Sequence, residues 1–186
     1  MKRIYLCRHG ETEWTLSGQH TGKTDVPLTQ KGREEAAQLR QRLENIPFER
    51  VFSSPRIRAL ESCHGMDPEV DVDLEEWRYG DYEGITSLEI QKINPGWNIF
   101  KDGAPHGESP AEAAARADRV LKKISHYKGN IALFSHGHFL RLLAARFLGL
   151  EPLMGSHLLL SVSSLSVLSY EKGIPVIALW NEQKTV

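Results

Sequence analysis

The sequence predicts an α/β fold, a three-layer α/β/α sandwich around a mostly parallel mixed sheet. Two apolar segments, residues 2–7 and 130–135, read as buried strands, and each delivers a histidine at its carboxyl end. Right-handed crossovers make such strands adjacent and parallel, so His9 and His136 are expected in one crevice at the carboxyl edge of the sheet. A predicted hairpin extends this sheet and consists of residues 165–170 and 174–180 around Glu171-Lys172-Gly173.

Capping residues and helical spacing define the other elements. Thr29 can cap a helix that runs to about Ile46, where Pro47 stops it. Residues 51–53 read as a second strand, and residues 55–63 as a turn followed by the start of a helix. Two capping boxes and one glycine stop mark three more helices: Thr86 with Glu89, Ser109-Pro110 with Glu112, and a helix from about Phe139 to Leu148 closed by Gly149.

Size, charge and cysteine content narrow the class of protein. With 186 residues, 40% of them hydrophobic, the chain is expected to form a single domain over residues 1–186. The formal net charge of -1 gives no global attraction to nucleic acid or to a membrane surface, so neither partner is expected. The apolar run 4–7 is too short for a signal-peptide core. Because only Cys7 and Cys63 are present, without metal-type spacing, a cytoplasmic protein with two free thiols is expected.

The residues at the two strand ends match the requirements of phosphoryl transfer. Removal of a phosphoryl group needs an in-line nucleophile, cationic donors for the equatorial oxygens and a proton for the leaving alkoxide. His9 can attack through one neutral ring nitrogen if the other nitrogen donates to a fixed acceptor. Arg8 and Arg58 can each bind phosphate oxygens through two N–H groups, and a protonated His136 would add a third cation.

These residues lie in motifs that resemble those of the histidine phosphatase superfamily, which includes the cofactor-dependent phosphoglycerate mutases. The motifs span nearly the whole chain and are Arg8-His9-Gly10-Glu11-Thr12, Asp25 to Thr29, Ser53-Ser54-Pro55 with Arg58, and Ser135-His136-Gly137-His138. The resemblance implies a phosphoglycerate mutase-like fold, a phosphohistidine on His9, a phosphate pocket of Arg8, Arg58 and His136, and neither metal nor cofactor.

The resemblance also assigns the proton donor and further substrate contacts. By the family pattern, in which the acid lies four residues before a glycine, the donor is Glu76, and Glu83 is expected to be structural. Substrate-binding positions carried over from the family are Thr15, Thr21, Gly22 and Gly137. The outer wall of the pocket is the least defined part, and Trp97, Lys101 and His106 are candidates for it.

Within the superfamily, residues 14–22, 76–84 and 97–103 look like the fungal sedoheptulose bisphosphatase branch. A phosphatase for a small-molecule phosphomonoester, a sugar phosphate or bisphosphate, is therefore expected. The chain is shorter than that branch after Cys63 and after Gly149, so part of the pocket should differ. The sequence does not predict the oligomeric state.

Two other functions remain open at this level. A mutase would return the phosphoryl group to a second hydroxyl, which requires a segment that keeps water from the intermediate, and this chain looks too short there. A catalytically silent phosphate-binding module would typically lack one of His9, Glu76 or the arginines, and all are present. The segment Gly18 to Thr24 imitates a nucleotide-binding loop, but Ser17 stands where the first glycine is required.

Overall fold

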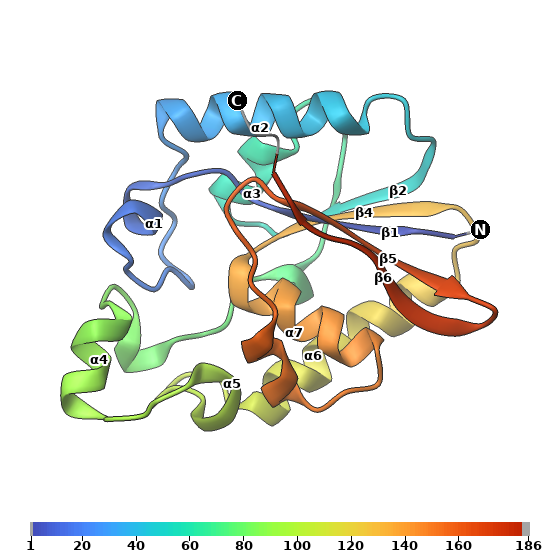
Figure 1. Ribbon diagram of the computed structural model, residues 1–186. Helices are drawn as coiled ribbons and strands as arrows, with labels where there is room; N and C mark the ends of the chain where they lie inside the picture. Colours follow the sequence, from blue (N-terminus) through green and yellow to red (C-terminus); the bar gives the residue numbers. More distant parts are fainter. Residues whose placement is uncertain (1, 184–186) are drawn as a thin grey trace.

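A six-stranded mixed sheet, in the order β3-β2-β4-β1-β5-β6, forms the middle layer of the structure, a computed structural model that describes residues 2–183 (Figure 1). Its strands are β1 (Ile4–Arg8), β2 (Phe48–Ser53), β3 (Glu69–Val70), β4 (Asn130–Ser135), β5 (Leu165–Glu171) and β6 (Ile174–Glu182). Strands β1 to β4 are parallel to one another, whereas the hairpin β5–β6 joins β1 in antiparallel orientation. The predicted α/β architecture with a mostly parallel mixed sheet is confirmed.

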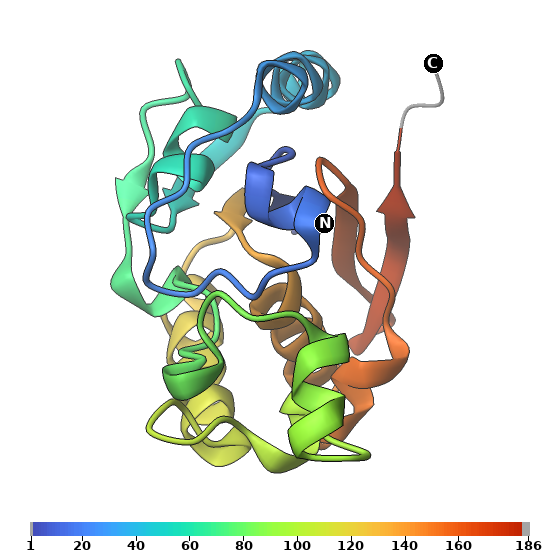
Figure 2. The ribbon, with the colours of Figure 1, turned by 90° about the vertical axis from the view of Figure 1, so that its left-hand side faces the viewer.

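Helices cover both faces of this sheet. They are α1 (Glu13–Ser17), α2 (Gln30–Leu43), α3 (Ile57–Ser62), α4 (Ser87–Ile93), α5 (Ile99–Asp102), α6 (Pro110–Ser125) and α7 (Gly137–Phe147), with short 3-10 helices η1 (Val72–Leu74), η2 (Gly80–Tyr82) and η3 (Pro152–His157). Helices α2 and α3 lie on one face, and α6 and α7 on the other (Figure 1). Helices α1, α4 and α5 lie beyond the end of the sheet where β1 and β4 terminate (Figure 2).

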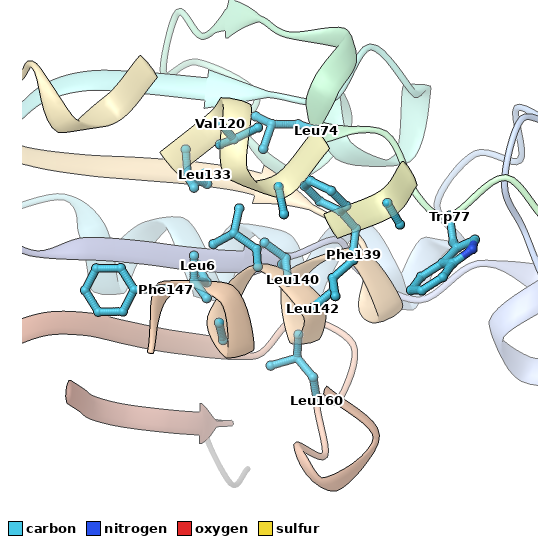
Figure 3. Packing of buried hydrophobic residues seen from close by; sticks show 14 of the residues in the cluster. Leu6, Leu74, Trp77, Val120, Leu133, Phe139, Leu140, Leu142, Phe147 and Leu160 are labelled. Atoms are coloured by element: carbon cyan, nitrogen blue, oxygen red, sulfur yellow. The ribbon is translucent and has the colours of Figure 1, made fainter. Parts of the chain in front are cut away.

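Strict alternation along the central strands sends side chains into two cores. On β1, Ile4 and Leu6 point toward α6 and α7, whereas Tyr5 and Cys7 point toward α2. Figure 3 shows Leu6 within the larger core, whose labelled members also include Leu133, Val120, Phe139 and Leu140. Burial of both faces explains the continuous apolar strands in the sequence and fixes the sheet edge at which they end.

Two helix boundaries differ from the sequence prediction, each for a local reason. Helix α2 ends at Leu43 rather than near Ile46 because Pro47 disfavours helical backbone at the residue before it. Helix α7 begins at Gly137, before the predicted Phe139, because the Glu76 carboxylate accepts hydrogen bonds from the backbone of its first turn. Glu76 is distant from α7 in the sequence, so the sequence around Gly137 does not predict that the helix begins there.

The predicted capping boxes are confirmed at both helix starts. Thr86 and Glu89 bond reciprocally at the start of α4, as do Ser109 and Glu112 at the start of α6. A third box, which the sequence analysis did not identify, joins Thr12 to Thr15 at the start of α1. Both cysteines are buried and free, and no helix among residues 2–183 is long and apolar enough to cross a membrane.

A buried ion pair fixes the loop that follows η1. Arg116 on α6 donates through Nε and Nη2 to the two carboxylate oxygens of Glu108, at 2.9 and 2.7 Å. The same guanidinium donates to the backbone carbonyls of Asp73, Glu75 and Glu76, and Glu108 is fully buried. One arginine therefore connects α6, Glu108 and the segment that carries Glu76.

We expect Arg116→Met to lower the free energy of unfolding by about 3–5 kcal/mol, because it leaves the fully buried Glu108 carboxylate with only the partly exposed Arg78, at 3.4 Å, as a cationic neighbour. Urea unfolding at pH 7 measures this change. The matched control is Arg119→Met on the same helix, whose pair with Asp73 is exposed and should contribute about 1 kcal/mol or less. Equal losses in the two variants would contradict the stabilising role of the buried pair.

Candidate active site

His9 follows the last residue of β1 and is held as a neutral imidazole. Its Nδ1 lies 2.8 Å from the carbonyl oxygen of Gly10, and because a carbonyl only accepts, Nδ1 carries the proton. Burial lowers the pKa of His9 well below its usual value, and the positive charges of Arg58 and Arg8 lower it further. The second ring nitrogen, Nε2, therefore keeps its lone pair.

His136 follows the last residue of β4 and lies beside His9. The strand register pairs Arg8 with Ser135, and the two imidazole centroids are 5.2 Å apart. The Nδ1 atom of His136 accepts from Arg58 Nε at 3.1 Å, so its Nε2 donates to the Ser54 hydroxyl at 2.7 Å. Burial, with Arg58 next in effect, lowers the pKa of His136 well below its usual value. The expected third cation is therefore not present in this arrangement, and the guanidinium groups carry the positive charge.

Arg58 lies fully buried in the first turn of α3 and donates four hydrogen bonds. Besides His136, its acceptors are the carbonyl oxygens of Thr24 at 3.0 Å, Thr21 at 2.9 Å and Gly22 at 3.0 Å. The guanidinium thus ties the 21–24 loop to the ends of β4 and α3. Direct contact of Arg58 with phosphate oxygens stays a prediction, because most of its N–H groups already have partners.

A cavity of about 160 Å³ opens in front of His9 at the carboxyl edge of the sheet. Six of the predicted site residues line it, namely Arg8, His9, Thr15, Thr21, Glu76 and Gly137. Arg58, His136 and Gly22 do not line it; Arg58 and His136 are fully buried, His136 beside His9 and Arg58 bonded to His136. The structure therefore brings the predicted residues to one place but divides them between the cavity wall and the layer behind it.

Arg8 presents a buried donor without a partner to this region. Its Nη1 donates to the Leu160 carbonyl, whereas its Nε is buried and has no hydrogen-bond partner within residues 2–183. A Cβ at Gly137 would lie 3.1 Å from Arg8 Cζ, so only glycine lets the guanidinium pack closely against the start of α7. A buried donor of this kind is normally satisfied by a water molecule or a ligand. Arg56 Nε, at a residue that does not line this cavity, also has no partner within residues 2–183.

The Glu76 side chain is positioned by main-chain amides. Its Oε1 accepts from Trp77 N at 2.9 Å and Phe139 N at 2.8 Å, and its Oε2 accepts from His138 N at 3.1 Å. The carboxyl group therefore lies at the N-terminus of α7 and lines the same cavity as His9. Its position fits the predicted proton donor.

Glu83 has the structural role expected for it. Its Oε1 accepts from the backbone N–H groups of Gly22 and Thr24 at 2.9 and 3.0 Å. These bonds fix the 21–24 loop and occupy the Gly22 amide that was predicted to meet substrate. The Thr15 hydroxyl is likewise used locally, because it accepts from Thr12 N and donates to Thr12 O.

Sequence reasoning missed a group of aromatic and cationic residues on the outer side of the cavity: His20, Tyr79, His138 and Arg141. The His20 ring stacks on Tyr79 at 4.7 Å, and the Tyr79 hydroxyl forms a hydrogen bond of 2.6 Å with His138 Nδ1. His138 follows the predicted Gly137 in the same motif, so the motif could have predicted it as a cavity residue. His20 had no such signal, since the 18–24 loop brings it to the cavity, whereas Arg141 lies one helical turn after the predicted Gly137 on α7.

The predicted outer wall is only partly found. Trp97 packs edge-on against His20 at 5.4 Å and lines a second cavity beside the first. Lys101 and His106 are exposed and line neither of these cavities. Among residues 2–183, no group of three His, Cys, Asp or Glu side chains is arranged to hold a metal ion.

Fold and site together define an α/β phosphatase with a buried histidine at the sheet edge. Residues 4–183 match the histidine phosphatase superfamily (branch 1), and the chain belongs to this family. An acid phosphatase of Mycobacterium tuberculosis is 38% identical over 95% of this chain and 91% of its own length. A sedoheptulose 1,7-bisphosphatase of Saccharomyces cerevisiae is 34% identical over 80% of this chain and 68% of its own.

Solved structures agree with this assignment. A protein from a Mycobacterium tuberculosis open reading frame superposes with a TM-score of 0.91 at 35% identity, covering 98% of each chain. A phosphoserine phosphatase of Entamoeba histolytica superposes with a TM-score of 0.86 at 28% identity, covering 99% of this chain and 98% of its own. The predicted family, the phosphoglycerate mutase-like fold and the phosphatase class are thereby confirmed.

Burial of the site imidazoles should make stability depend on pH. Desolvation lowers the pKa of His20 from 6.5 to about 4, so the unfolded chain binds this proton more readily than the folded protein. The stabilisation is complete above pH 6.5 and is lost as the pH falls toward 4. Between pH 7 and pH 5, His20 alone should account for a loss of about 2 kcal/mol.

Urea unfolding at several pH values, for the unmodified protein and for His20→Gln, measures this contribution. The loss on acidification should be smaller in His20→Gln by about that amount. Identical pH profiles for His20→Gln and the unmodified protein would show that the imidazole titrates normally.

Proposed function

We propose that the protein hydrolyses a small-molecule phosphomonoester, a sugar phosphate or bisphosphate, through a phosphohistidine on His9. The observation that carries the proposal is the buried, unpartnered Nε of Arg8 beside a neutral imidazole whose Nδ1 is fixed by Gly10. A phosphate oxygen supplies the acceptor that Arg8 Nε needs, and the phosphorus atom then faces the free lone pair of His9 Nε2.

The first step forms one bond and breaks one. The Nε2 lone pair of His9 attacks phosphorus, the ester P–O bond breaks, and Glu76 gives a proton to the leaving alkoxide. Arg8 and Arg58 stabilise the charge on the equatorial oxygens, with His136 behind His9. The hydrogen bond from Nδ1 to Gly10 stabilises the cationic imidazole of the intermediate.

The second step reverses these roles. Glu76 accepts a proton from water, the water oxygen attacks phosphorus, and the P–N bond breaks to restore neutral His9 and release inorganic phosphate. Thr15, Thr21 and Gly137 line the cavity and act in positioning, whereas Gly22 acts through the loop that Arg58 and Glu83 hold.

Relatives support a sugar phosphate as the substrate class. Besides the sedoheptulose 1,7-bisphosphatase, they include a glucosyl-3-phosphoglycerate phosphatase of Mycolicibacterium vanbaalenii, 28% identical over 83% of this chain and 80% of its own. The proposal also takes residues 1–186 as one domain acting in the cytoplasm, which agrees with the two free, buried cysteines.

His9→Ala should remove nearly all phosphatase activity, because it removes the Nε2 lone pair that attacks phosphorus in the proposed mechanism. Release of inorganic phosphate from sugar phosphates and from p-nitrophenyl phosphate measures this loss. In the unmodified protein, acid-labile and base-stable labelling from a radioactive phosphomonoester should appear on His9. Full activity in His9→Ala would refute the mechanism, and phosphoryl transfer between substrate hydroxyls without phosphate release would identify a mutase.

Glu76→Gln should slow cleavage of alkyl phosphates by about 10²- to 10⁴-fold, since it removes the proton donor. An activated aryl phosphate needs little protonation and should be cleaved at nearly the normal rate in the first step. Thermal unfolding of the variant separates this effect from a loss of the backbone contacts that Glu76 makes. Equal losses on both kinds of ester would indicate that Glu76 only positions the substrate.

A further inference from the structure

Gly10 holds His9 in one tautomer, yet packing requires the most flexible amino acid at this position. The Gly10 carbonyl accepts from His9 Nδ1 at 2.8 Å. A Cβ at Gly10 would lie 2.3 Å from the carbonyl oxygen of Gly32 on α2, so no larger residue fits. Because glycine restricts its own backbone angles very little, contacts with the rest of the fold must fix the peptides beside it.

The peptide between His9 and Gly10 is held at both of its ends. The His9 carbonyl accepts from Ser163 N at 3.0 Å, and the Gly10 amide donates to Ser62 Oγ at 3.1 Å. Gly10 is buried, and Ser62 Oγ is the acceptor for its amide within residues 2–183. Rotation of this peptide would change the φ of Gly10 and move its carbonyl away from His9 Nδ1.

The Ser62 hydroxyl has a single orientation. Ser62 is the last residue of α3 and is fully buried, and its Oγ donates to the Arg58 carbonyl at 2.7 Å. Since a carbonyl only accepts, the hydroxyl proton is used there, and an oxygen lone pair is left for the Gly10 amide. Arg40 on α2 donates to the carbonyls of Glu61 and Ser62 at 3.3 and 3.2 Å, which holds the end of α3 in place.

We propose that Ser62 is a positioning residue for the nucleophile: its hydroxyl fixes the peptide between His9 and Gly10 and so keeps the Gly10 carbonyl at His9 Nδ1. This inference rests on the proposed function, in which His9 Nε2 attacks phosphorus. Because the same hydroxyl bonds to the backbone of Arg58, one side chain connects the nucleophile segment to the helix that carries this arginine. Ser62 acts through Gly10 and does not line the cavity in front of His9.

Ser62→Ala tests this role in the chemical step. The variant should lower the single-turnover rate constant for release of p-nitrophenol by about 10- to 100-fold, because a misplaced nucleophile reacts slowly even when substrate is bound. The substrate concentration that gives half of the maximal rate should change by less than about threefold, since Ser62 does not contact substrate. Ser62→Thr keeps the hydroxyl, and threonine in a helix can bond to the same carbonyl, so it should regain most of the lost rate.

The matched control is Ser166→Ala on β5. Ser166 is also fully buried, and its Oγ accepts from Asn181 N at 2.9 Å, so this variant loses the same kind of bond within the β5–β6 hairpin. Its melting temperature should fall, whereas its single-turnover rate should stay normal. Where activity has been shown to depend on His9, a folded Ser62→Ala variant with the normal rate would overturn the proposal. A folded Ser62→Thr variant as slow as Ser62→Ala would overturn it as well.

Imidazole NMR tests the same role without turnover. Nitrogen–proton correlations of isotope-labelled histidine distinguish the Nδ1–H from the Nε2–H tautomer, and the signals missing in His9→Ala identify His9. His9 should be in the Nδ1–H form in the unmodified protein, and the Nε2–H form should appear in Ser62→Ala. An unchanged tautomer would refute the role of Ser62 even where catalysis by His9 is established. Where His9→Ala remains active and the proposed function fails, the tautomer alone decides, and its change in Ser62→Ala would support the positioning role.

Discussion

Positive charge at the carboxyl edge of the sheet, fully buried at Arg58 and partly buried at Arg8, is the constraint on which the site depends. Arg8 and Arg58 are placed among imidazoles that burial keeps neutral, and neither guanidinium forms an ion pair with a carboxylate among residues 2–183. Taking an unpaired charge out of water is costly, and carbonyl dipoles around Arg58 offset only part of that cost. A phosphate dianion provides the missing counter-charge, so the electrostatics that strain the folded protein favour substrate.

The fold supplies this arrangement by linking the site to its rigid parts. The register of β1 and β4 sets the spacing of His9 and His136, and Gly137 allows Arg8 to pack against α7. Glu76 belongs to an irregular segment, yet the α7 amides on one side and the Arg116–Glu108 pair on the other fix it. The Glu76 carboxylate is therefore held by hydrogen bonds on one side and by the Arg116–Glu108 pair on the other, although it lies outside any helix or strand.

The sequence was sufficient to predict those features in which a functional or capping residue lies within a recognisable strand or helix pattern. Apolar strands ending in His9 and His136 predicted the sheet edge, and capping boxes predicted the starts of α4 and α6. The sequence was insufficient where a side chain forms hydrogen bonds with residues far away in the chain. The sequence around Gly22 does not show that its amide donates a hydrogen bond to Glu83. The sequence around Arg58 likewise does not show that its guanidinium donates to carbonyl groups of the 21–24 loop. The place of Arg58 behind His9, rather than in the cavity wall, follows from these tertiary hydrogen bonds.

The residues proposed to carry out the reaction and those that surround the rest of the substrate also differ in how the fold holds them. His9, His136 and Gly137 lie at the ends of β1 and β4 and at the start of α7, which the hydrophobic core holds in place. The outer wall depends more on loops and short helices: the 18–24 loop presents His20, and carbonyl groups of η3 hold the side chain of Arg141, which itself lies on α7. Loops tolerate change that a strand register does not. Relatives named for quite different phosphate esters can therefore share one sheet edge, and the identity of the substrate is determined by the residues that sequence motifs leave unassigned.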